Sequence, residues 1–412
     1  MGVKDGHSRG PGPGVAAIGA VAWAALCAGC VISSDFSGTS FLCTQEPVCP
    51  DGYACVDGHC VTAGPGADAG AGGSDGGAVV PTDFRVRRQL IIDSAGRGRL
   101  EGFPLMVRLD PDRIEYDELR PDAGDLLFTD AAGAALPHEI ETWNPGGESI
   151  VWVRVPALEE GASTSIWMYY GSDTATGMED EEAVWTSYRA VYHLNTAAEA
   201  EVDDSTGQDF DGVAVGSEIV AGVIGEARQF DGVDDHVDLG TGRAFFAGVS
   251  AITFEAWVQP SQLAGPGIVF ASSINGDDVS RVEVRTVVGP AFDAGGRTAD
   301  AGEILRSEQV AIGAGGWSWV VAVYDFPGDS ISLYLDGALA GTTSGLGFGP
   351  STPDTTADQT VLAVDENLGN NFFPGVLDEV RVSSDAKSAD WIAAQHAAMR
   401  DALVTYGAAE PL

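Results

Sequence analysis

The chain has 412 residues, 44% of them hydrophobic and 20% charged, which allows two or three globular domains with cores of their own. Its formal net charge is −40. A chain of this charge is repelled by nucleic acid and by anionic membrane surfaces, so we expect neither as a binding partner. The charge indicates solubility or, as the alternative, cation binding.

Residues 1–29 have the pattern of a signal peptide. Lys4 and Arg9 give a basic start, and the apolar run VAAIGAVAWAALCAGC follows at 15–30. An apolar run of ~15 residues suits a signal peptide, because a transmembrane helix needs ~20. The sequence therefore predicts export.

The run ends in Ala28-Gly29-Cys30, which resembles the lipobox of bacterial lipoproteins, with Cys27 where Leu is usual. The resemblance implies that Cys30 becomes the lipidated first residue of the mature chain, and lipid is the only membrane contact that we expect. Val31 follows where inner-membrane retention would favour Asp, so we expect an outer-membrane lipoprotein of the cell envelope. Secretion with a free Cys30 is the alternative.

Residues 30–62 predict a small disulfide-rich module. An even set of cysteines stands close together in CTQEPVCPDGYACVDGHC, which in an exported chain indicates disulfides. The four are Cys43, Cys49, Cys55 and Cys60. Their pairing is open, and zinc held with His59 is a rival that an oxidising compartment disfavours. The module resembles a short EGF-type stalk, and the Gly/Ala-rich residues 63–82 predict a flexible linker.

Residues 83–176 alternate at period two, as in FRVRRQLIID and SIVWVRVPAL. In the second run valines at alternate positions face one side, with Trp152 and Arg154 on the other. Turn signals separate such runs, so we expect an antiparallel β-sandwich.

Three segments of this region, FPLMVRLD, LLFTDAAGAALPHEIETW and VWVRVPALEEGASTSIWMYYG, resemble the DUF2341 family of extracytoplasmic bacterial domains. The resemblance implies an architecture, because the family has no established activity. Its members often precede laminin-G-like domains and are sometimes encoded with proteins of the ExbB/TolQ type.

Five segments then follow in order: VYHLNTAAEAEVDDSTGQDFDG, IGEARQFDGVDDHVDLG, AITFEAWVQPS, GWSWVVAVYDFPGDSISLYLDGALAG and FFPGVLDEVRVSSDAKSADWI. This set, over residues 186–384, resembles a laminin-G-like jelly roll of the concanavalin-A type. The expected fold class is therefore all-β, with two tandem β-sandwiches. Asp336-Gly337 predicts a hairpin turn with positive φ at both positions. Residues 385–412 predict a C-terminal helix, with Ser388 as its N-cap, and a closing strand.

The loop RQFDGVDDHVDLG crowds aspartates that have two interpretations. They satisfy turns by bonding their own backbone, or they join carboxylates of other loops around one structural calcium ion, which takes six to eight oxygens. Relatives of the jelly roll often bind calcium near such loops, so the resemblance favours calcium, although no EF-hand spacing is present. The expected ligands are Asp204 and Asp378 first, then Asp231, Asp234 and Asp235.

The sequence predicts no catalytic residue. The Glu-x-Asp-x-x-Glu pattern of jelly-roll hydrolases and the Gly-x-Ser-x-Gly elbow are both absent. The alternative pair is Glu139 and Glu141, which share one face of HEIETW beside His138 and would serve a divergent glycoside hydrolase. His193 lies in a strand-like run and is interpreted as a residue at the core edge.

Sugar sites on such folds combine aromatic faces with amide or carboxylate groups. The expected ligand-binding residues are Trp257, Trp319, Asn370 and Asn371, with core packing as the alternative for the tryptophans. The predicted function is a non-catalytic, lipid-anchored surface protein that binds a glycan or a protein through its laminin-G-like domain. The alternative is a structural or accessory component of an envelope transport machine of the ExbB/TolQ type.

Overall fold

The computed structural model describes residues 53–56, 59–62 and 81–412, apart from 176, 197–199, 262–264, 275–280, 290, 300–302, 314 and 358. The chain divides into two units, Met1–Asp75 and Gly76–Leu412. The predicted signal peptide, the predicted lipidation site Cys30, and Cys43 and Cys49 lie outside the described residues.

The first unit contains one described hairpin. Strand β1 (Tyr53–Val56) pairs antiparallel with β2 (His59–Thr62), and the register sets Cys55 opposite Cys60. The predicted disulfides stay a prediction.

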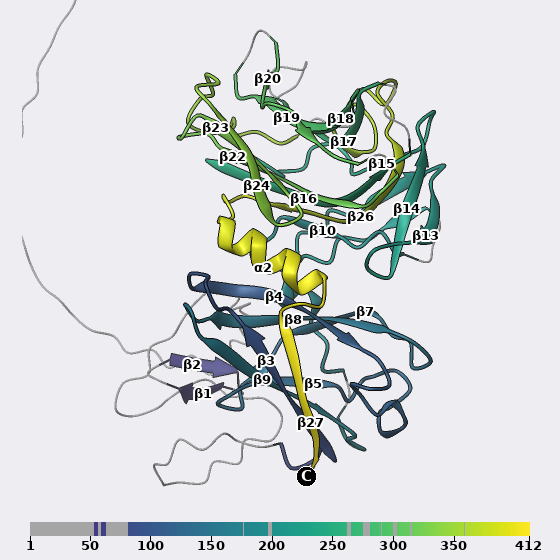
Figure 1. Cartoon of the computed structure of the whole chain (residues 1–412), viewed down its shortest axis with the longest axis vertical. Helices are drawn as coiled ribbons and strands as arrows, with labels where there is room; N and C mark the ends of the chain where they lie inside the picture. Colours follow the sequence, from purple (N-terminus) through teal and green to yellow (C-terminus); the bar gives the residue numbers. More distant parts are fainter. Residues whose placement is uncertain are drawn as a thin grey trace, which may run out of the picture. The chain divides into compact units, whose positions relative to one another are not determined.

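The second unit begins with a β-sandwich made of two sheets (Figure 1). The five-stranded sheet has the order β27 (Val404–Pro411), β3 (Val86–Asp93), β9 (Ser163–Tyr170), β5 (Leu127–Asp130), β6 (Ala135–Leu136). The three-stranded sheet has the order β4 (Leu100–Leu109), β8 (Ser149–Leu158), β7 (His138–Thr142). The turn η1 (Tyr116–Glu118) follows β4. Apolar side chains from both sheets, such as Leu90, Phe103, Val151 and Ile166, fill the space between them.

The last strand of the chain belongs to this first sandwich. In the register, Val404 lies opposite Ile92 and Pro411 opposite Val86. Leu412 N–H donates to the Arg85 carbonyl oxygen at 2.8 Å. The sequence predicted the strand but not its partner, and the first sandwich therefore contains both an early and a late part of the chain.

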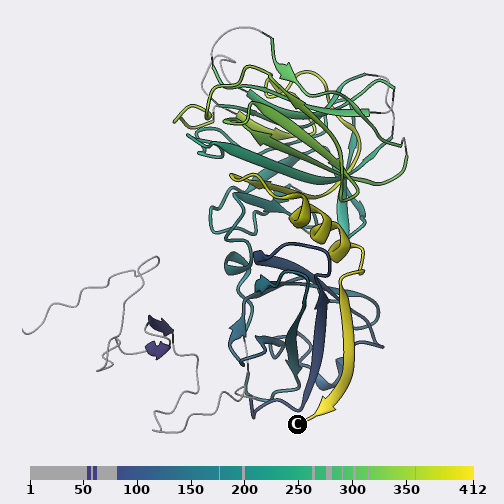
Figure 2. The same cartoon turned by 60° about the vertical axis from the view of Figure 1, so that its left-hand side comes forward.

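The second sandwich also consists of two antiparallel sheets (Figure 2). The eight-stranded sheet has the order β13 (Glu218–Ala221), β14 (Glu226–Asp231), β26 (Pro374–Ser383), β16 (Ala251–Pro260), β22 (Ser318–Asp325), β23 (Ser330–Leu335), β24 (Ala338–Ser344), with β10 (Ala190–Tyr192) also on β26. The nine-stranded sheet has the order β11 (Glu201–Val202), β12 (Gly212–Val215), β15 (His236–Asp238), β25 (Gln359–Leu362), β17 (Gly267–Ser273), β18 (Arg281–Val287), β19 (Ala291–Arg297), β20 (Leu305–Arg306), with β21 (Val310–Ala311) also on β19. The core between them is rich in aromatic side chains, including Phe230, Phe254, Phe270 and Tyr324.

Two local predictions are confirmed. Asp336 and Gly337, between β23 and β24, have φ values of +47° and +81°, as the hairpin turn requires. Helix α2 (Ala389–Met399) starts at Ser388, whose hydroxyl accepts a hydrogen bond from Trp391 N–H at 3.1 Å. The other described α-helix, α1 (Glu181–Val184), lies between the sandwiches in the sequence.

Helix α2 packs on β4 of the first sandwich and on β24 of the second (Figures 1 and 2). One continuous apolar cluster runs from Phe103 through Trp391 to Trp257 and Trp319. The two sandwiches therefore share a core at this junction. No helix in the described part of the chain has the length and apolarity to cross a membrane.

Candidate functional site

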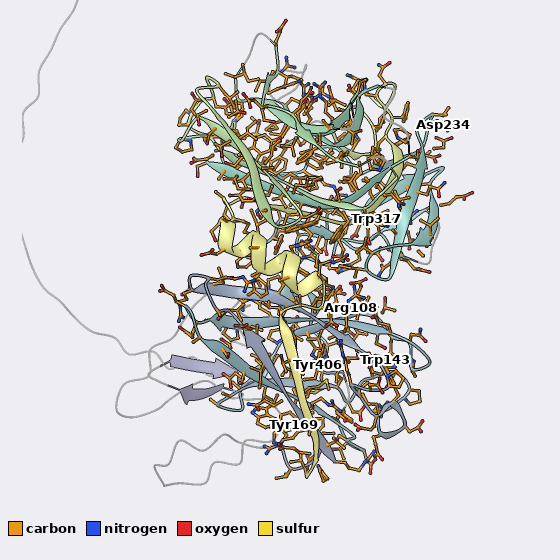
Figure 3. All side chains as sticks on the ribbon, viewed as in Figure 1. Arg108, Trp143, Tyr169, Asp234, Trp317 and Tyr406 are labelled. Carbon is orange, nitrogen blue, oxygen red and sulfur yellow. The ribbon has the colours of Figure 1, made fainter. Side chains whose placement is uncertain are left out.

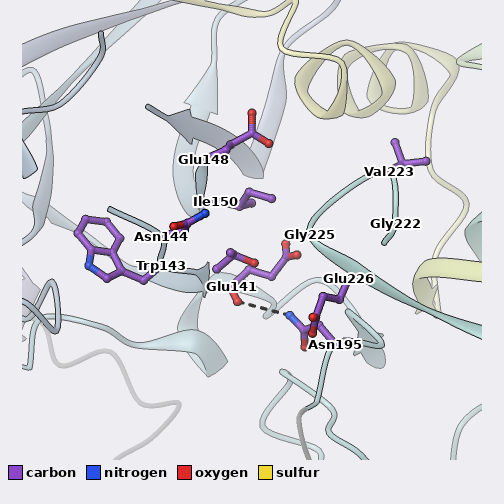
Figure 4. Close-up of a pocket in the computed structure, with 11 residues that line it drawn as sticks. Glu141, Trp143, Asn144, Glu148, Ile150, Asn195, Gly222, Val223, Gly225 and Glu226 are labelled. Atoms are coloured by element: carbon purple, nitrogen blue, oxygen red, sulfur yellow. Dashed lines mark hydrogen bonds between the residues drawn. The ribbon is translucent and has the colours of Figure 1, made fainter. Parts of the chain in front are cut away.

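A cleft of about 560 Å³ lies where the two sandwiches meet (Figure 4). One wall comes from β7 and the segment after it, and the other from the turn between β13 and β14. Its polar side chains include three carboxylates, two amides and an indole: Glu141, Glu148, Glu226, Asn144, Asn195 and Trp143. Among the described residues that line the cleft, none is basic.

The carboxylate of Asp378, on β26, holds the turn between β13 and β14 by hydrogen bonds to its backbone. Asp378 Oδ2 accepts hydrogen bonds from the N–H groups of Val223 at 2.7 Å and Ile224 at 3.0 Å. Arg108, from the first sandwich, donates to the Val223 carbonyl oxygen at 3.3 Å and pairs with Glu148. The cleft wall is thus held by side chains of both sandwiches.

The same turn approaches Glu141 closely because it carries a glycine. Gly225 has φ +55°, and a Cβ at this position would lie 3.0 Å from Glu141 Oε1 and 2.9 Å from Thr142 Oγ1. A larger residue would therefore be strained and would press on the cleft wall.

Behind the cleft, Glu141 belongs to a buried group of charged side chains centred on His193. The Nδ1 atom of His193 lies 2.6 Å from Glu379 Oε1 and 3.6 Å from Glu141 Oε2. Its Nε2 atom lies 3.2 Å from Glu139 Oε2. These four side chains are at most 6% exposed, so the charges compensate each other with little help from water.

The carboxylates of the first sandwich have further partners. Trp152 Nε1 donates to Glu141 Oε2 at 2.7 Å. Ser205 Oγ donates to Glu139 Oε1 at 2.7 Å, and Trp185 Nε1 donates to the other oxygen of Glu139. Glu141 Oε1 has no hydrogen-bond partner among the described residues.

A β-bulge places Glu379 in the group. The β16–β26 register shifts so that Glu379 and Val380 lie opposite Ala256 alone, and Glu379 has φ +52°. Bulges re-aim side chains and are frequent beside functional sites. Glu379 Oε2 accepts from Arg381, whose guanidinium carbon lies 4.2 Å from the ring centre of Trp152.

Charge and burial shift the pKa values of this group in opposite directions. Burial alone would lower the pKa of His193, but attraction by Glu379 and Glu139 raises it well above its usual value. Burial and repulsion by Glu379 raise the pKa of Glu141 to about 8. Burial would also raise the pKa of Glu379, but the positive charges of His193 and Arg381 lower it to about 2. His193 and Glu141 therefore keep their protons to higher pH than usual, whereas Glu379 stays ionised to lower pH.

The loop of Asp231, Asp234 and Asp235 is a second group whose oxygens lie close together. Asp231 and Asp234 are exposed, and Figure 3 shows Asp234 at the periphery of the second sandwich. Asp235 Oδ2 accepts from Asp231 N–H at 2.8 Å, and Asp231 Oδ1 accepts from Val233 N–H at 2.7 Å. This is the backbone bonding of the turn interpretation.

The structure does not bring the two first-ranked calcium ligands to this loop. Asp204 accepts from the N–H groups of Val191, Thr206 and Phe210 and thus holds its own loop together. Asp378 holds the β13–β14 turn. Neither belongs to a group of candidate ligands among the described residues, so the structure brings together three of the five expected carboxylates, and calcium binding stays a prediction.

The predicted aromatic ligand-binding residues lie in the shared core. Trp257 and Trp319 are 2% and 1% exposed. Trp257 Nε1 contacts Met399 Sδ at 3.4 Å, and Trp319 stacks on His396 with 5.8 Å between ring centres. Helix α2 therefore covers both rings, which corrects the expectation of a sugar-binding surface and agrees with core packing.

The predicted amides are exposed but lie apart from the cleft. The Asn371 side chain donates to Asp365 Oδ2 at 3.1 Å, and the Asn370 carbonyl oxygen accepts from Asp365 N–H at 3.2 Å. Neither amide lines the cleft.

The sequence indicated the pair of Glu139 and Glu141. It predicted neither the cleft beside them nor the contacts of His193 with both. The signal was present in the alternation of β7 and β8, which puts Glu139, Glu141 and Trp152 on faces away from the first core. Charged and aromatic side chains on such a face indicate a covering partner, but the sequence does not tell which one.

Two family comparisons match this architecture. Residues 122–213 match the domain of unknown function DUF2341, and residues 231–393 match the Concanavalin A-like lectin/glucanases superfamily. The chain therefore contains a DUF2341 domain followed by a laminin-G-like domain, in the predicted order. The DUF2341 match extends past the first sandwich and includes His193.

Solved structures with similar folds have low identity. Domain 4 of AbnA, a GH43 extracellular arabinanase from Geobacillus stearothermophilus, solved with arabinotriose, is 18% identical over 50% of this chain and 97% of its own, with a TM-score of 0.37. The binding domain of Paraclostridial Mosquitocidal Protein 1 is 11% identical over 51% and 52%, with a TM-score of 0.41. A heptameric SAP-like pentraxin from Limulus polyphemus is 16% identical over 40% and 78%, with a TM-score of 0.32. No curated protein matches the chain.

Proposed function

We propose that this chain is a non-catalytic, lipid-anchored protein of the cell envelope that binds a neutral or cationic glycan in the cleft between its two sandwiches. The observation that carries the proposal is the composition of that cleft. A half-buried indole, two amides and three carboxylates line it without a basic residue. Sugar sites combine an aromatic face with a few polar groups that fix orientation.

The charge of the cleft restricts the ligand. Glu148 is paired with Arg108, and Glu141 is buried with a raised pKa, so Glu226 is the lining carboxylate whose charge is left without a basic neighbour among the lining residues. Sulfated, phosphorylated or otherwise anionic ligands would be repelled, whereas hydroxyl groups and amino groups would be attracted. The proposed ligand class is therefore uncharged or amino-bearing oligosaccharide, with a Lys- or Arg-rich protein segment as the other outcome of a binding screen.

The test is a glycan array with the full-length protein, followed by calorimetry on each hit. We expect binding that Trp143→Ala weakens by about two- to tenfold, since aromatic stacking contributes ~0.5–1.5 kcal/mol. Trp317→Ala is the control: Trp317 is also half-buried but does not line the cleft. Equal loss in both variants, or binding only to anionic glycans, would contradict the proposal.

A further inference from the structure

The buried group behind the cleft has the arrangement of a metal centre. His193 Nδ1 and a carboxylate oxygen from each of Glu141 and Glu379 all lie within 4.8 Å of one another. Imidazole nitrogen with carboxylate oxygens is a ligand set that Zn²⁺ accepts. The three ligands come from β7, from the segment after β10, and from the bulge in β26.

One buried carboxylate oxygen of this group, Glu141 Oε1, has no hydrogen-bond donor among the described residues. The Glu141 side chain is 0% exposed, and its Oε1 atom has no hydrogen bond among the described residues. Its other oxygen lies 3.6 Å from His193 Nδ1, too far for a hydrogen bond. An unpaired buried carboxylate oxygen costs stability, and a cation bound by both oxygens of Glu141 would remove that cost.

Each candidate ligand also has a partner of its own outside the trio. His193 Nε2 faces Glu139 at 3.2 Å, which would leave Nδ1 as the nitrogen free to bind a metal. Glu141 accepts from Trp152 Nε1, and Glu379 accepts from Arg381. Carboxylate–histidine–metal chains of this kind orient ligands in known zinc sites.

An ion could reach the group from solvent, because Glu141 lines the cleft while His193 and Glu379 lie behind it. We infer that Glu141, His193 and Glu379 form a Zn²⁺-binding site that joins the DUF2341 domain to the laminin-G-like domain. Binding releases two protons to solvent, the one on His193 Nδ1 and the one on the Glu141 carboxyl group, and the Nδ1 lone pair and the Glu141 carboxylate then bond the ion. A fourth ligand comes from water in the cleft.

The inference does not depend on the glycan. It concerns the junction of the sandwiches, and its test uses the metal alone. Full-length protein is freed of metal, dialysed against Zn²⁺ or Co²⁺, and measured by elemental analysis, visible absorption and thermal unfolding.

We expect one equivalent of Zn²⁺ per chain, a visible Co²⁺ band, and a higher Tm with metal than with chelator. X-ray absorption would show one nitrogen and two or more oxygens at about 2.0–2.2 Å. Glu141→Gln removes one ligand while keeping its shape, and we expect affinity to fall by more than the roughly 10–100-fold that loss of an outer partner costs.

The matched control is Asp234→Asn, which alters the exposed acidic loop and should leave Zn²⁺ binding unchanged. Because His193→Gln leaves the buried Glu139 and Glu379 without their shared partner and so threatens the fold itself, Glu141→Gln is the deciding variant. Substoichiometric Zn²⁺ in the wild-type protein, or unchanged affinity in Glu141→Gln, would overturn the inference. Loss of binding in Asp234→Asn would overturn it as well, because it would assign the metal to the loop.

Discussion

Two groups of neighbouring carboxylates in the described part of the chain differ in burial and in how far apart their residues lie in the sequence. The loop of Asp231, Asp234 and Asp235 is short in sequence, and its carboxylates accept hydrogen bonds from their own backbone. The group of Glu141, His193 and Glu379 is assembled from distant segments. Two of its members, His193 and Glu379, are 186 residues apart.

The comparison shows that crowding of carboxylates in the sequence does not predict how strongly their charges affect stability. Burial decides that effect. Water screens the exposed carboxylates of Asp231 and Asp234, so these two contribute little to stability. Burial removes that screening at the junction, where every charge needs a partner. The following experiments test this contrast, beginning with the largest expected effect.

Glu379→Ala should be the most destabilising single change of the two groups. It leaves His193 and Arg381 buried without their shared carboxylate, and removal of one partner of a buried ion pair costs about 3–5 kcal/mol. Urea unfolding of the full-length protein measures it. Asp234→Ala is the matched control, and equal losses in the two variants would remove the distinction between the groups.

The buried histidines should respond to pH in opposite ways. Burial lowers the pKa of His138 to about 4, whereas carboxylates raise that of His193. Because the unfolded chain protonates His138 near pH 6.5, stability from its neutral form is present above that pH and is lost as pH falls toward 4. The loss is about 3 kcal/mol.

Unfolding free energies of the metal-free protein between pH 7 and pH 4 measure this effect, and His138→Gln should flatten the curve. Histidine NMR adds a direct readout, with His193 expected to lose its proton at a higher pH than an ordinary histidine. A curve unchanged by His138→Gln would show that other groups cause the acid sensitivity.

Gly225→Ala should cost more than Gly242→Ala, although both glycines have positive φ. The left-handed conformation alone costs an alanine about 1–2 kcal/mol. A Cβ at Gly242 meets nothing within 4 Å, whereas one at Gly225 meets Glu141 and Thr142. The difference between the two unfolding free energies measures the cost of the steric clash with Glu141 and Thr142. A difference of zero would mean that these side chains move aside without cost.

Calcium should have the smallest effect. The sequence predicts a calcium site, and only the three aspartates of the exposed loop lie together. At a concentration equal to Kd, one bound ion stabilises the fold by about 0.4 kcal/mol. Thermal unfolding with millimolar calcium and with chelator should show a small rise in Tm that Asp231→Asn removes. A rise that survives this substitution would place calcium elsewhere.

The sequence allowed the local features to be predicted because they depend on neighbouring residues. Period-two alternation predicted the strands, Asp336-Gly337 the hairpin turn, and Ser388 the start of the helix. Each is decided within a few residues by backbone geometry or one hydrogen bond.

The junction could not be predicted, because it depends on contacts between residues that are far apart in the sequence. The side chains that meet His193 come from β7 and β26, and nothing in HEIETW or LDEVRV specifies the other as its neighbour. Trp257 and Trp319 were assigned to a ligand surface because alternation reveals that a strand has two faces. Only the tertiary structure shows that α2 covers the outer one.

The pairing of β27 with β3 has a consequence for how the protein is made. Arg87 and Glu410, which form an ion pair across these strands, are separated by 323 residues. During synthesis, the edge of the first sheet stays open while the entire laminin-G-like domain emerges. An open sheet edge invites pairing with other chains. The nascent protein thus depends on whatever protects that edge, a chaperone or rapid folding of the second sandwich, until its final strand arrives.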